Sequence, residues 1–199
     1  MVLTKLKNKT QNFVGGLALK LYKFKIKPNH LTISGLLLSC FSAICYYNWK
    51  LSVILSILAP TLLLLSGFLD LLDGVLARVS GELSPLGGFL DSMADRYADS
   101  IILTGIILGG LCNQFSGLLA LIGSVMVSYS RARAEVEGVK METVGFAERP
   151  ERILILAFSS FASIIWPNFI NLAIMFLALI THLTVIQRVF HVFEKLSGV

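Results

Sequence analysis

The sequence D-L-L-D-G-V-L-A-R occupies residues 70–78 and directly follows the uncharged, apolar run 51–69. A second motif, G-G-F-L-D-S-M-A-D, occupies residues 87–95. An apolar run of this length is typical of a membrane-spanning helix. A charged residue near the middle of such a helix costs roughly 2.5–3.5 kcal/mol on insertion scales. The aspartates of both motifs must therefore line a polar cavity, lie near the membrane interface, or bind cations.

The spacing of the aspartates indicates that they act together. Asp70 and Asp73 are three residues apart and Asp91 and Asp95 are four apart, so each pair shares one face of a helix. A hairpin at about residues 81–85 would bring the two faces, and therefore the four carboxylates, together. Like charges that close repel each other unless a cation lies between them. Carboxylate oxygens in this number suit Mg²⁺, Mn²⁺ or Ca²⁺.

The composition of the chain is that of a membrane protein. Of its 199 residues, 55% are hydrophobic and 15% are charged, and the mean hydropathy is +0.78. This length suits one polytopic domain. The net charge of +5 does not indicate nucleic-acid binding, because the lysines cluster before Pro28 and most other cations lie between apolar segments.

Apolar segments that could span the membrane lie at about residues 31–47, 51–77, 86–110, 115–136, 150–166 and 168–189. The turns on one side carry Lys50 as their cation, whereas the opposite ends hold the basic N-terminus and the arginines. This asymmetry predicts that both termini and the aspartate motifs are cytoplasmic. We expect an all-α integral protein of the cell membrane, with a six-transmembrane-helix bundle formed by residues 28–199.

Residues 1–27 are predicted to form a basic amphipathic segment beside the membrane domain. Lysines alternate there with apolar residues that are three or four positions apart, which is the spacing of one helix face. Such a helix would lie on the cytoplasmic surface, with membrane lipids as its partner. A solvated basic tail is the alternative interpretation.

The complete pattern D-x2-D-G-x2-A-R-x8-G-x3-D-x3-D resembles the signature of the CDP-alcohol phosphotransferases (CDP-alcohol phosphatidyltransferases). These are integral membrane enzymes of phospholipid synthesis, and every fixed position of their signature is present here. The resemblance implies a homodimer and a site for two divalent ions, Mg²⁺ or Mn²⁺. The implied metal ligands are Asp70, Asp73, Asp91 and Asp95. Asp95 is also the implied general base, which activates the acceptor hydroxyl while CMP leaves.

The same resemblance implies which residues bind the CDP-linked lipid, either CDP-diacylglycerol or CDP-archaeol. Arg78 can reach a phosphate, and Gly74 allows a close approach. The P-N-x-x-T stretch at residues 28–32 contributes to this site in the family, although it also fits ordinary helix capping. For Ser84, capping of the next helix is an equally good interpretation. The implied set is Asn29, Thr32, Gly74, Arg78, Ser84 and Gly87.

A second polar cluster contains R-A-R-A-E-V-E-G at residues 131–138 and G-F-A-E-R-P-E-R at residues 145–152. Guanidinium groups suit phosphate binding, although arginines at a membrane interface also snorkel. These stretches resemble the subgroup that makes phosphatidylinositol phosphate, or its archaeal ether-lipid counterpart, from inositol phosphate. The implied acceptor-phosphate residues are Arg131, Arg133, Arg149 and Arg152, with Lys140 and Arg188 as further candidates.

Two alternatives stay open at this point. The same chemistry with glycerol 3-phosphate is one, because an arginine cluster recognises the phosphate and says little about the polyol. A membrane ion or metal transporter is the remote alternative, since intramembrane aspartates can form a translocation site. The sequence has no apparent inverted repeat, which disfavours a transporter. Asp99 continues the four-residue step after Asp95 but lies outside the signature; a hydrogen bond within the bundle and indirect support of the site are its two interpretations, and it is left out of the predicted site.

Overall fold

A computed structural model describes residues 14–141 and 144–197, and every regular element within these ranges is helical. Each predicted apolar segment overlaps one helix, and the last helix, at residues 169–196, extends seven residues past the end of its predicted segment, 168–189. The elements in chain order are α2 (Pro28–Tyr47), the short 3-10 helix η1 (Trp49–Leu51), α3 (Val53–Ser80), α4 (Pro85–Leu108), α5 (Gln114–Val136), α6 (Arg149–Ser163) and α7 (Phe169–Leu196).

Four of the described helices, α2, α3, α5 and α7, are long and apolar enough to cross a membrane. Helix α4 carries charged residues in its first half, and α6 has only 15 residues. At 1.5 Å per residue, a helix of that length spans about 22 Å, which is less than the roughly 30 Å hydrocarbon core. The apolar helices thus support the prediction of an all-α membrane protein, and the number of six crossings stays a prediction.

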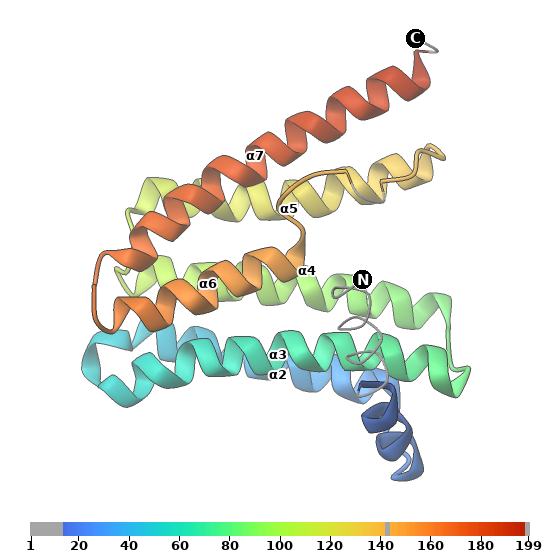
Figure 1. Cartoon of the computed structure of the whole chain (residues 1–199), viewed down its shortest axis with the longest axis horizontal. Coiled ribbons are helices and arrows are strands. Elements are labelled where there is room, and N and C mark those ends of the chain that lie inside the picture. Colours follow the sequence, from blue (N-terminus) through green and yellow to red (C-terminus); the bar gives the residue numbers. More distant parts are fainter. Residues whose placement is uncertain (1–13, 142–143, 198–199) are drawn as a thin grey trace, which may run out of the picture.

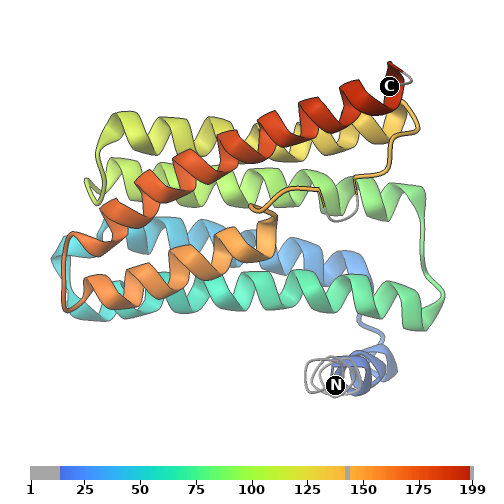
Figure 2. The same ribbon diagram turned by 45° about the horizontal axis from the view of Figure 1, so that its top comes forward.

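The helices lie side by side in one bundle, with their directions alternating along the chain (Figures 1 and 2). Helix α2 packs against α3 and α4, α5 packs against α4 and α7, and α6 packs against α3 and α7. Hydrophobic burial adds little to helix association in lipid, so close packing and buried hydrogen bonds hold such a bundle together. Gly105 of α4 lies so close to the Ala43 backbone of α2 that a Cβ would overlap it. Ser39 and Ser66 share a buried 2.7 Å hydrogen bond between α2 and α3.

The N-terminal segment predicted at residues 1–27 is described only in part. Residues 14–23 are helical and run across the ends of α2 and α3 (Figures 1 and 2). Leu17 and Leu21 pack against the cluster that contains Leu72 of α3, while the lysines of this stretch are exposed. This arrangement fits an amphipathic helix, and residues 1–13 lie outside the described part of the chain.

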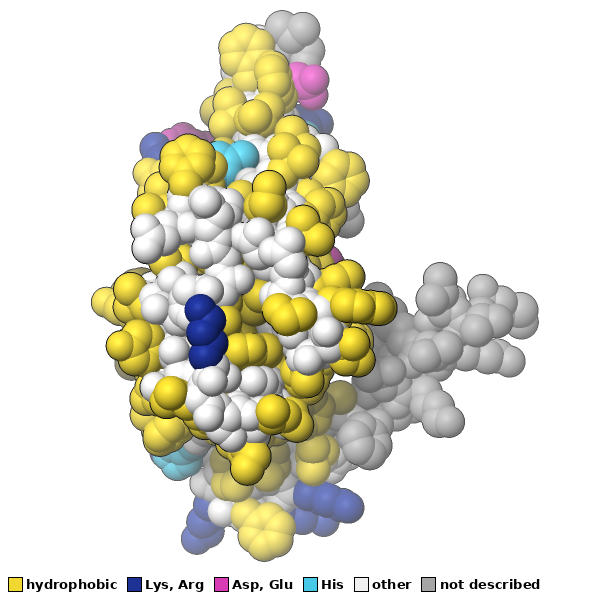
Figure 3. Space-filling model, turned by 90° about the vertical axis from the view of Figure 1, so that its left-hand side faces the viewer, with side chains coloured by type: hydrophobic (Ala, Val, Ile, Leu, Met, Phe, Trp, Pro, Cys, Tyr) yellow, Lys and Arg dark blue, Asp and Glu magenta, His cyan; other side chains and the backbone are white. Residues whose placement is uncertain are grey.

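The two ends of the bundle differ in charge. Figure 3 views the end where α2 joins α3, α4 joins α5 and α6 joins α7, and this face is mostly hydrophobic or uncharged. Lys50 in η1 belongs to this end and donates a 3.1 Å hydrogen bond to the carbonyl oxygen of Gly110. The motif aspartates lie in the other half of the bundle: Asp70 and Asp73 are in the second half of α3, and Asp91 and Asp95 are in the first half of α4.

Candidate active site

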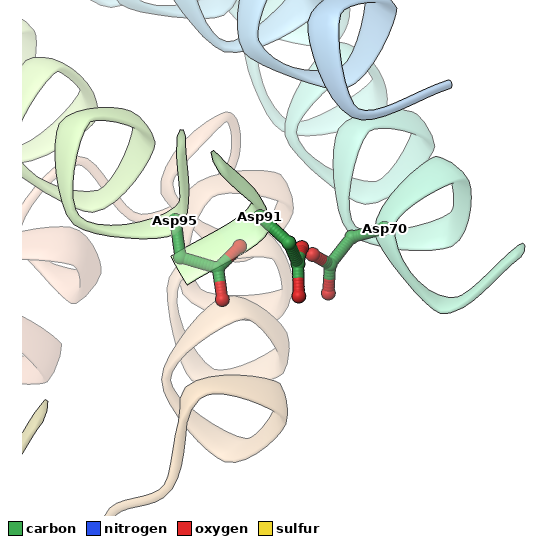
Figure 4. A group of neighbouring side chains, drawn as sticks. All are labelled: Asp70, Asp91 and Asp95. Carbon is green, nitrogen blue, oxygen red and sulfur yellow. The ribbon is translucent and has the colours of Figure 1, made fainter. Parts of the chain in front are cut away.

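Three aspartates from two helices form a compact carboxylate cluster. Asp70 comes from α3, and Asp91 and Asp95 lie one turn apart on α4. One oxygen from each carboxylate lies within 4.8 Å of the other two, and the side chains point toward one another (Figure 4). We call these three residues the aspartate cluster. The predicted convergence of the two motifs is therefore seen for three of their four aspartates.

The hairpin between α3 and α4 sets the register of the cluster. Gly81 ends α3 with a left-handed backbone (φ 71°), a conformation that side chains with a Cβ rarely adopt. The Ser84 hydroxyl caps α4 by accepting a 3.0 Å hydrogen bond from the Gly87 backbone N–H, and Pro85 occupies the first turn. The turn predicted at residues 81–85 is present, and Ser84 does cap the following helix.

Asp73 lies beside the aspartate cluster rather than within it. Its carboxylate accepts a 2.6 Å hydrogen bond from the Thr32 hydroxyl of α2, and the residue is only 4% exposed. The sequence prediction placed all four aspartates in one metal site. The structure groups Asp70, Asp91 and Asp95 and holds Asp73 against α2.

Arg149, at the start of α6, is paired with the cluster. Its Nη1 lies 2.6 Å from Asp70 Oδ2 and 2.7 Å from Asp95 Oδ1. Its Nε lies 3.4 Å from Asp99 Oδ1. One guanidinium therefore offsets part of the negative charge that the carboxylates concentrate between the helices.

The donor atoms of the cluster fit a hard divalent cation. The three carboxylates offer only oxygen ligands, which Mg²⁺ and Mn²⁺ prefer. Asp91 Oδ1 is buried and has no hydrogen-bond partner among the described residues. A buried carboxylate oxygen without a partner is costly, and a bound cation would remove that cost. The residues present are therefore suited to hold a divalent metal.

One cavity, of about 200 Å³, lies between α2, α3 and α4 beside the cluster. It is lined by Asp73 and Asp91 and by every residue predicted to contact the CDP-linked lipid, namely Asn29, Thr32, Gly74, Arg78, Ser84 and Gly87. We call it the donor cavity. A Cβ at Gly87 would lie 3.0 Å from the Ser84 hydroxyl oxygen and 3.5 Å from Asn29 Oδ1, so a side chain at this position would crowd the wall of the cavity.

A second cavity, of about 520 Å³, opens between α4, α5, α6 and α7. We call it the acceptor cavity. It is lined by the aspartate cluster and by five arginines, namely Arg96, Arg131, Arg149, Arg152 and Arg188. The structure thus brings three of the four predicted acceptor arginines to one place. Arg133 is the exception, because it pairs with Glu137 and lines a separate cavity with Val189 and Val192. Lys140 is exposed and does not line the acceptor cavity.

Arg188 of α7 lines the acceptor cavity, although the sequence analysis named it only as a further candidate. It is only 2% exposed, and its Nε donates a 2.9 Å hydrogen bond to the Val144 carbonyl oxygen. Its Nη2 lies 3.6 Å from Glu148 Oε1. An arginine within an apolar membrane helix is costly and usually has a functional reason. The position of Arg188 inside the apolar segment 168–189 is the sequence feature that could have placed it among the main acceptor-phosphate candidates.

The fold and these two cavities define a class of membrane enzyme. Residues 25–186 match the family model of CDP-alcohol phosphatidyltransferase. The chain belongs to this family, as the aspartate motif indicated. Family membership leaves the transporter alternative without support.

Specific relatives narrow the comparison. The archaetidylinositol phosphate synthase of Pyrococcus horikoshii is 40% identical over 196 residues, which are 98% of this chain and 99% of the relative. The crystal structure of the phosphatidylinositol phosphate synthase of Mycobacterium tuberculosis with CDP-DAG bound has a TM-score of 0.79 and 26% identity, covering 92% of this chain and 94% of that one. Its complex with manganese and citrate also has a TM-score of 0.79 and 26% identity, covering 90% and 88%. These names agree with the subgroup that the arginine stretches resemble.

Proposed function

We propose that this protein transfers the phosphatidyl or archaetidyl group of a CDP-linked lipid to a hydroxyl of inositol phosphate and releases CMP. The main support for this proposal is that the aspartate cluster lies between the two cavities. Asp91 lines both of them. One cavity contains the residues expected for the CDP-linked lipid, and the other contains arginines suited to a phosphorylated acceptor. The relatives add support, because they are named for the synthesis of inositol phosphate lipids.

The donor cavity supports binding of the CDP-linked lipid. Arg78 offers a guanidinium to the pyrophosphate, and the glycine wall at Gly74 and Gly87 allows the ligand to approach the backbone. We propose two divalent ions, Mg²⁺ or Mn²⁺, held by the four aspartates of the motif. Bound metal would neutralise the pyrophosphate and stabilise the charge on departing CMP. The manganese complex of the Mycobacterium tuberculosis relative supports this proposal.

The acceptor cavity supports recognition of a phosphate beside the reacting atoms. Arg131, Arg149 and Arg188 line it with Arg152, and their charge would hold the phosphate of inositol phosphate. Arg133 is left out of this set, because it lines another cavity and not the acceptor cavity.

Asp95 is the proposed general base, since it belongs to the cluster and also lines the acceptor cavity. Its carboxylate would take the proton from the acceptor hydroxyl while that oxygen attacks the lipid-side phosphorus. The bond from this phosphorus to the bridging oxygen of CMP then breaks. CMP carries away the electron pair of that bond.

The membrane arrangement that we propose follows from the same features. Residues 28–199 form one domain that crosses the cell membrane six times, with α4 and α6 packed among the four apolar helices. Both termini and the active site are cytoplasmic, because the turns at the opposite end carry little charge. The helix at residues 14–23 lies on the membrane surface, and the protein is a homodimer.

The test is CMP release by the purified protein with a CDP-linked lipid and Mg²⁺. Inositol phosphate, glycerol 3-phosphate, free inositol and serine are offered in parallel. Release with inositol phosphate alone is expected. Release with glycerol 3-phosphate alone would support the transfer reaction and contradict inositol phosphate as the acceptor. No release with any acceptor would contradict the whole proposal.

A further inference from the structure

Asp99 joins two of the acceptor-cavity arginines to helix α4. It lies one turn beyond Asp95, and its side chain is 14% exposed. Asp99 Oδ2 accepts a 2.6 Å hydrogen bond from Arg152 Nη2, and Asp99 Oδ1 lies 3.4 Å from Arg149 Nε. A single carboxylate thus contacts both arginines at the start of α6.

Arg152 depends on Asp99 for its position. The residue is only 3% exposed, so its charge requires a partner inside the protein. Its Nη1 donates a 2.8 Å hydrogen bond to the Ala147 carbonyl oxygen, and Asp99 is the carboxylate within ion-pair distance of its Nη2. The pair therefore fixes the loop before α6 as well as the guanidinium itself.

Arg149 is held from two directions. Its Nη1 faces Asp70 and Asp95, which belong to the aspartate cluster, whereas its Nε faces Asp99, which does not. A divalent cation bound to the cluster would compete for the carboxylate oxygens of Asp70 and Asp95. The contact with Asp99 would still hold the guanidinium at the edge of the acceptor cavity.

We propose that Asp99 is a positioning residue for acceptor recognition, which holds Arg149 and Arg152 in register with the aspartate cluster. Asp99 lines neither the donor cavity nor the acceptor cavity, so it acts through the arginines and not on a substrate directly. The inference rests on the proposed function, because it requires a phosphorylated acceptor. It assigns a role to a residue that lies outside the signature motif.

The first experiment compares full-length Asp99→Asn, Asp99→Glu and wild-type protein in CMP release. Asp99→Asn is expected to raise the KM for inositol phosphate about tenfold and to change the KM for the CDP-linked lipid less than about twofold. Asp99→Glu keeps the negative charge, so its KM for inositol phosphate should lie between those of the wild-type protein and Asp99→Asn. Binding of Mn²⁺, followed by the electron paramagnetic resonance of the free ion, should change much less than the KM for inositol phosphate, because Asp99 is outside the cluster. Glu137→Gln is the control, since it removes an acid whose arginine partner lies outside the acceptor cavity.

A double-mutant cycle with Arg152→Gln tests whether Asp99 acts through the arginine. Neutralising both members of a buried pair avoids an unpaired charge, so the double variant should fold even where Asp99→Asn alone is unstable. The effects on the KM for inositol phosphate should be strongly non-additive. Additive effects, an equal rise in both KM values, or a lower Tm with unchanged KM would overturn the inference. Wild-type protein that releases no CMP with inositol phosphate would instead contradict the proposed function.

Discussion

Arg149 Nη1 lies 2.6 Å from Asp70 Oδ2, and this contact joins the first residue of α6 to the second half of α3. The same nitrogen lies 2.7 Å from Asp95 Oδ1. The guanidinium therefore occupies the boundary between the carboxylates suited to metal and the cavity suited to the acceptor phosphate. Substitution of Arg149 should therefore change the binding of metal and of the acceptor, and it should leave the binding of the CDP-linked lipid largely unchanged.

Replacing Arg149 by glutamine should weaken acceptor binding selectively. The loss of a charged hydrogen bond to phosphate, about 1.5–3 kcal/mol, corresponds to a rise of roughly 10- to 150-fold in the KM for inositol phosphate. The affinity for Mn²⁺ should stay equal or increase, because a competing positive charge is removed from the cluster. Steady-state kinetics and Mn²⁺ titration measure the two effects. Arg133→Gln is the matched control, and an equal rise in the KM for the CDP-linked lipid would contradict the assignment.

Asp95→Asn should abolish turnover while the CDP-linked lipid still binds. An amide of the same shape cannot accept the proton of the acceptor hydroxyl, and loss of a general base typically costs about 10²–10⁴-fold in rate. The measurements are kcat for CMP release and equilibrium binding of the CDP-linked lipid with Mg²⁺ present. Turnover near the wild-type rate would remove Asp95 from the role of base.

Removing divalent metal should stop CMP release, and adding Mg²⁺ or Mn²⁺ should restore it. Asp91→Asn should weaken Mn²⁺ binding by at least about tenfold, because Asp91 contributes to the cluster a buried oxygen that has no hydrogen-bond partner in the described part of the chain. Titration of the variant and the wild-type protein with Mn²⁺ measures this directly. Unchanged Mn²⁺ affinity would show that the metal is bound elsewhere.

Gly87→Ala should impair donor binding. The added methyl group would lie 3.0 Å from the Ser84 hydroxyl oxygen and narrow the donor cavity. We expect the KM for the CDP-linked lipid to rise several-fold, on the order of 1 kcal/mol for an overpacked contact, with little change for inositol phosphate. Gly88→Ala should have a smaller effect, because a Cβ there meets no atom within 4 Å. Equal effects of the two substitutions would argue against a close wall at Gly87.

Much of the candidate site could be predicted because its information is local. A spacing of three or four residues places two side chains on one helix face wherever the helix lies, which grouped Asp91 with Asp95. The short turn after Gly81 then requires α4 to run antiparallel to α3, and α2 packs against both of these helices. The donor cavity forms between the same hairpin and the start of α2, and the six residues that the family resemblance implied all lie along it.

The remainder depends on how the helices are rotated against one another. Arg131 and Arg133 are two residues apart and therefore point to different sides of α5, so only the packing of α5 against α4 and α7 selects Arg131 for the acceptor cavity. Arg188 enters the same cavity from a helix far along the chain, where it is buried.

Sequence alone determined the membrane class, the family and the carboxylate chemistry, because these depend on composition and on spacing within single helices. Only the tertiary structure decided that Asp73 bonds to Thr32, that Arg149 bridges Asp70 and Asp95, and that Asp99 holds two arginines. Each of these contacts joins two helices. Its distance is set by the rotation and offset of both helices in the bundle, which no local pattern specifies.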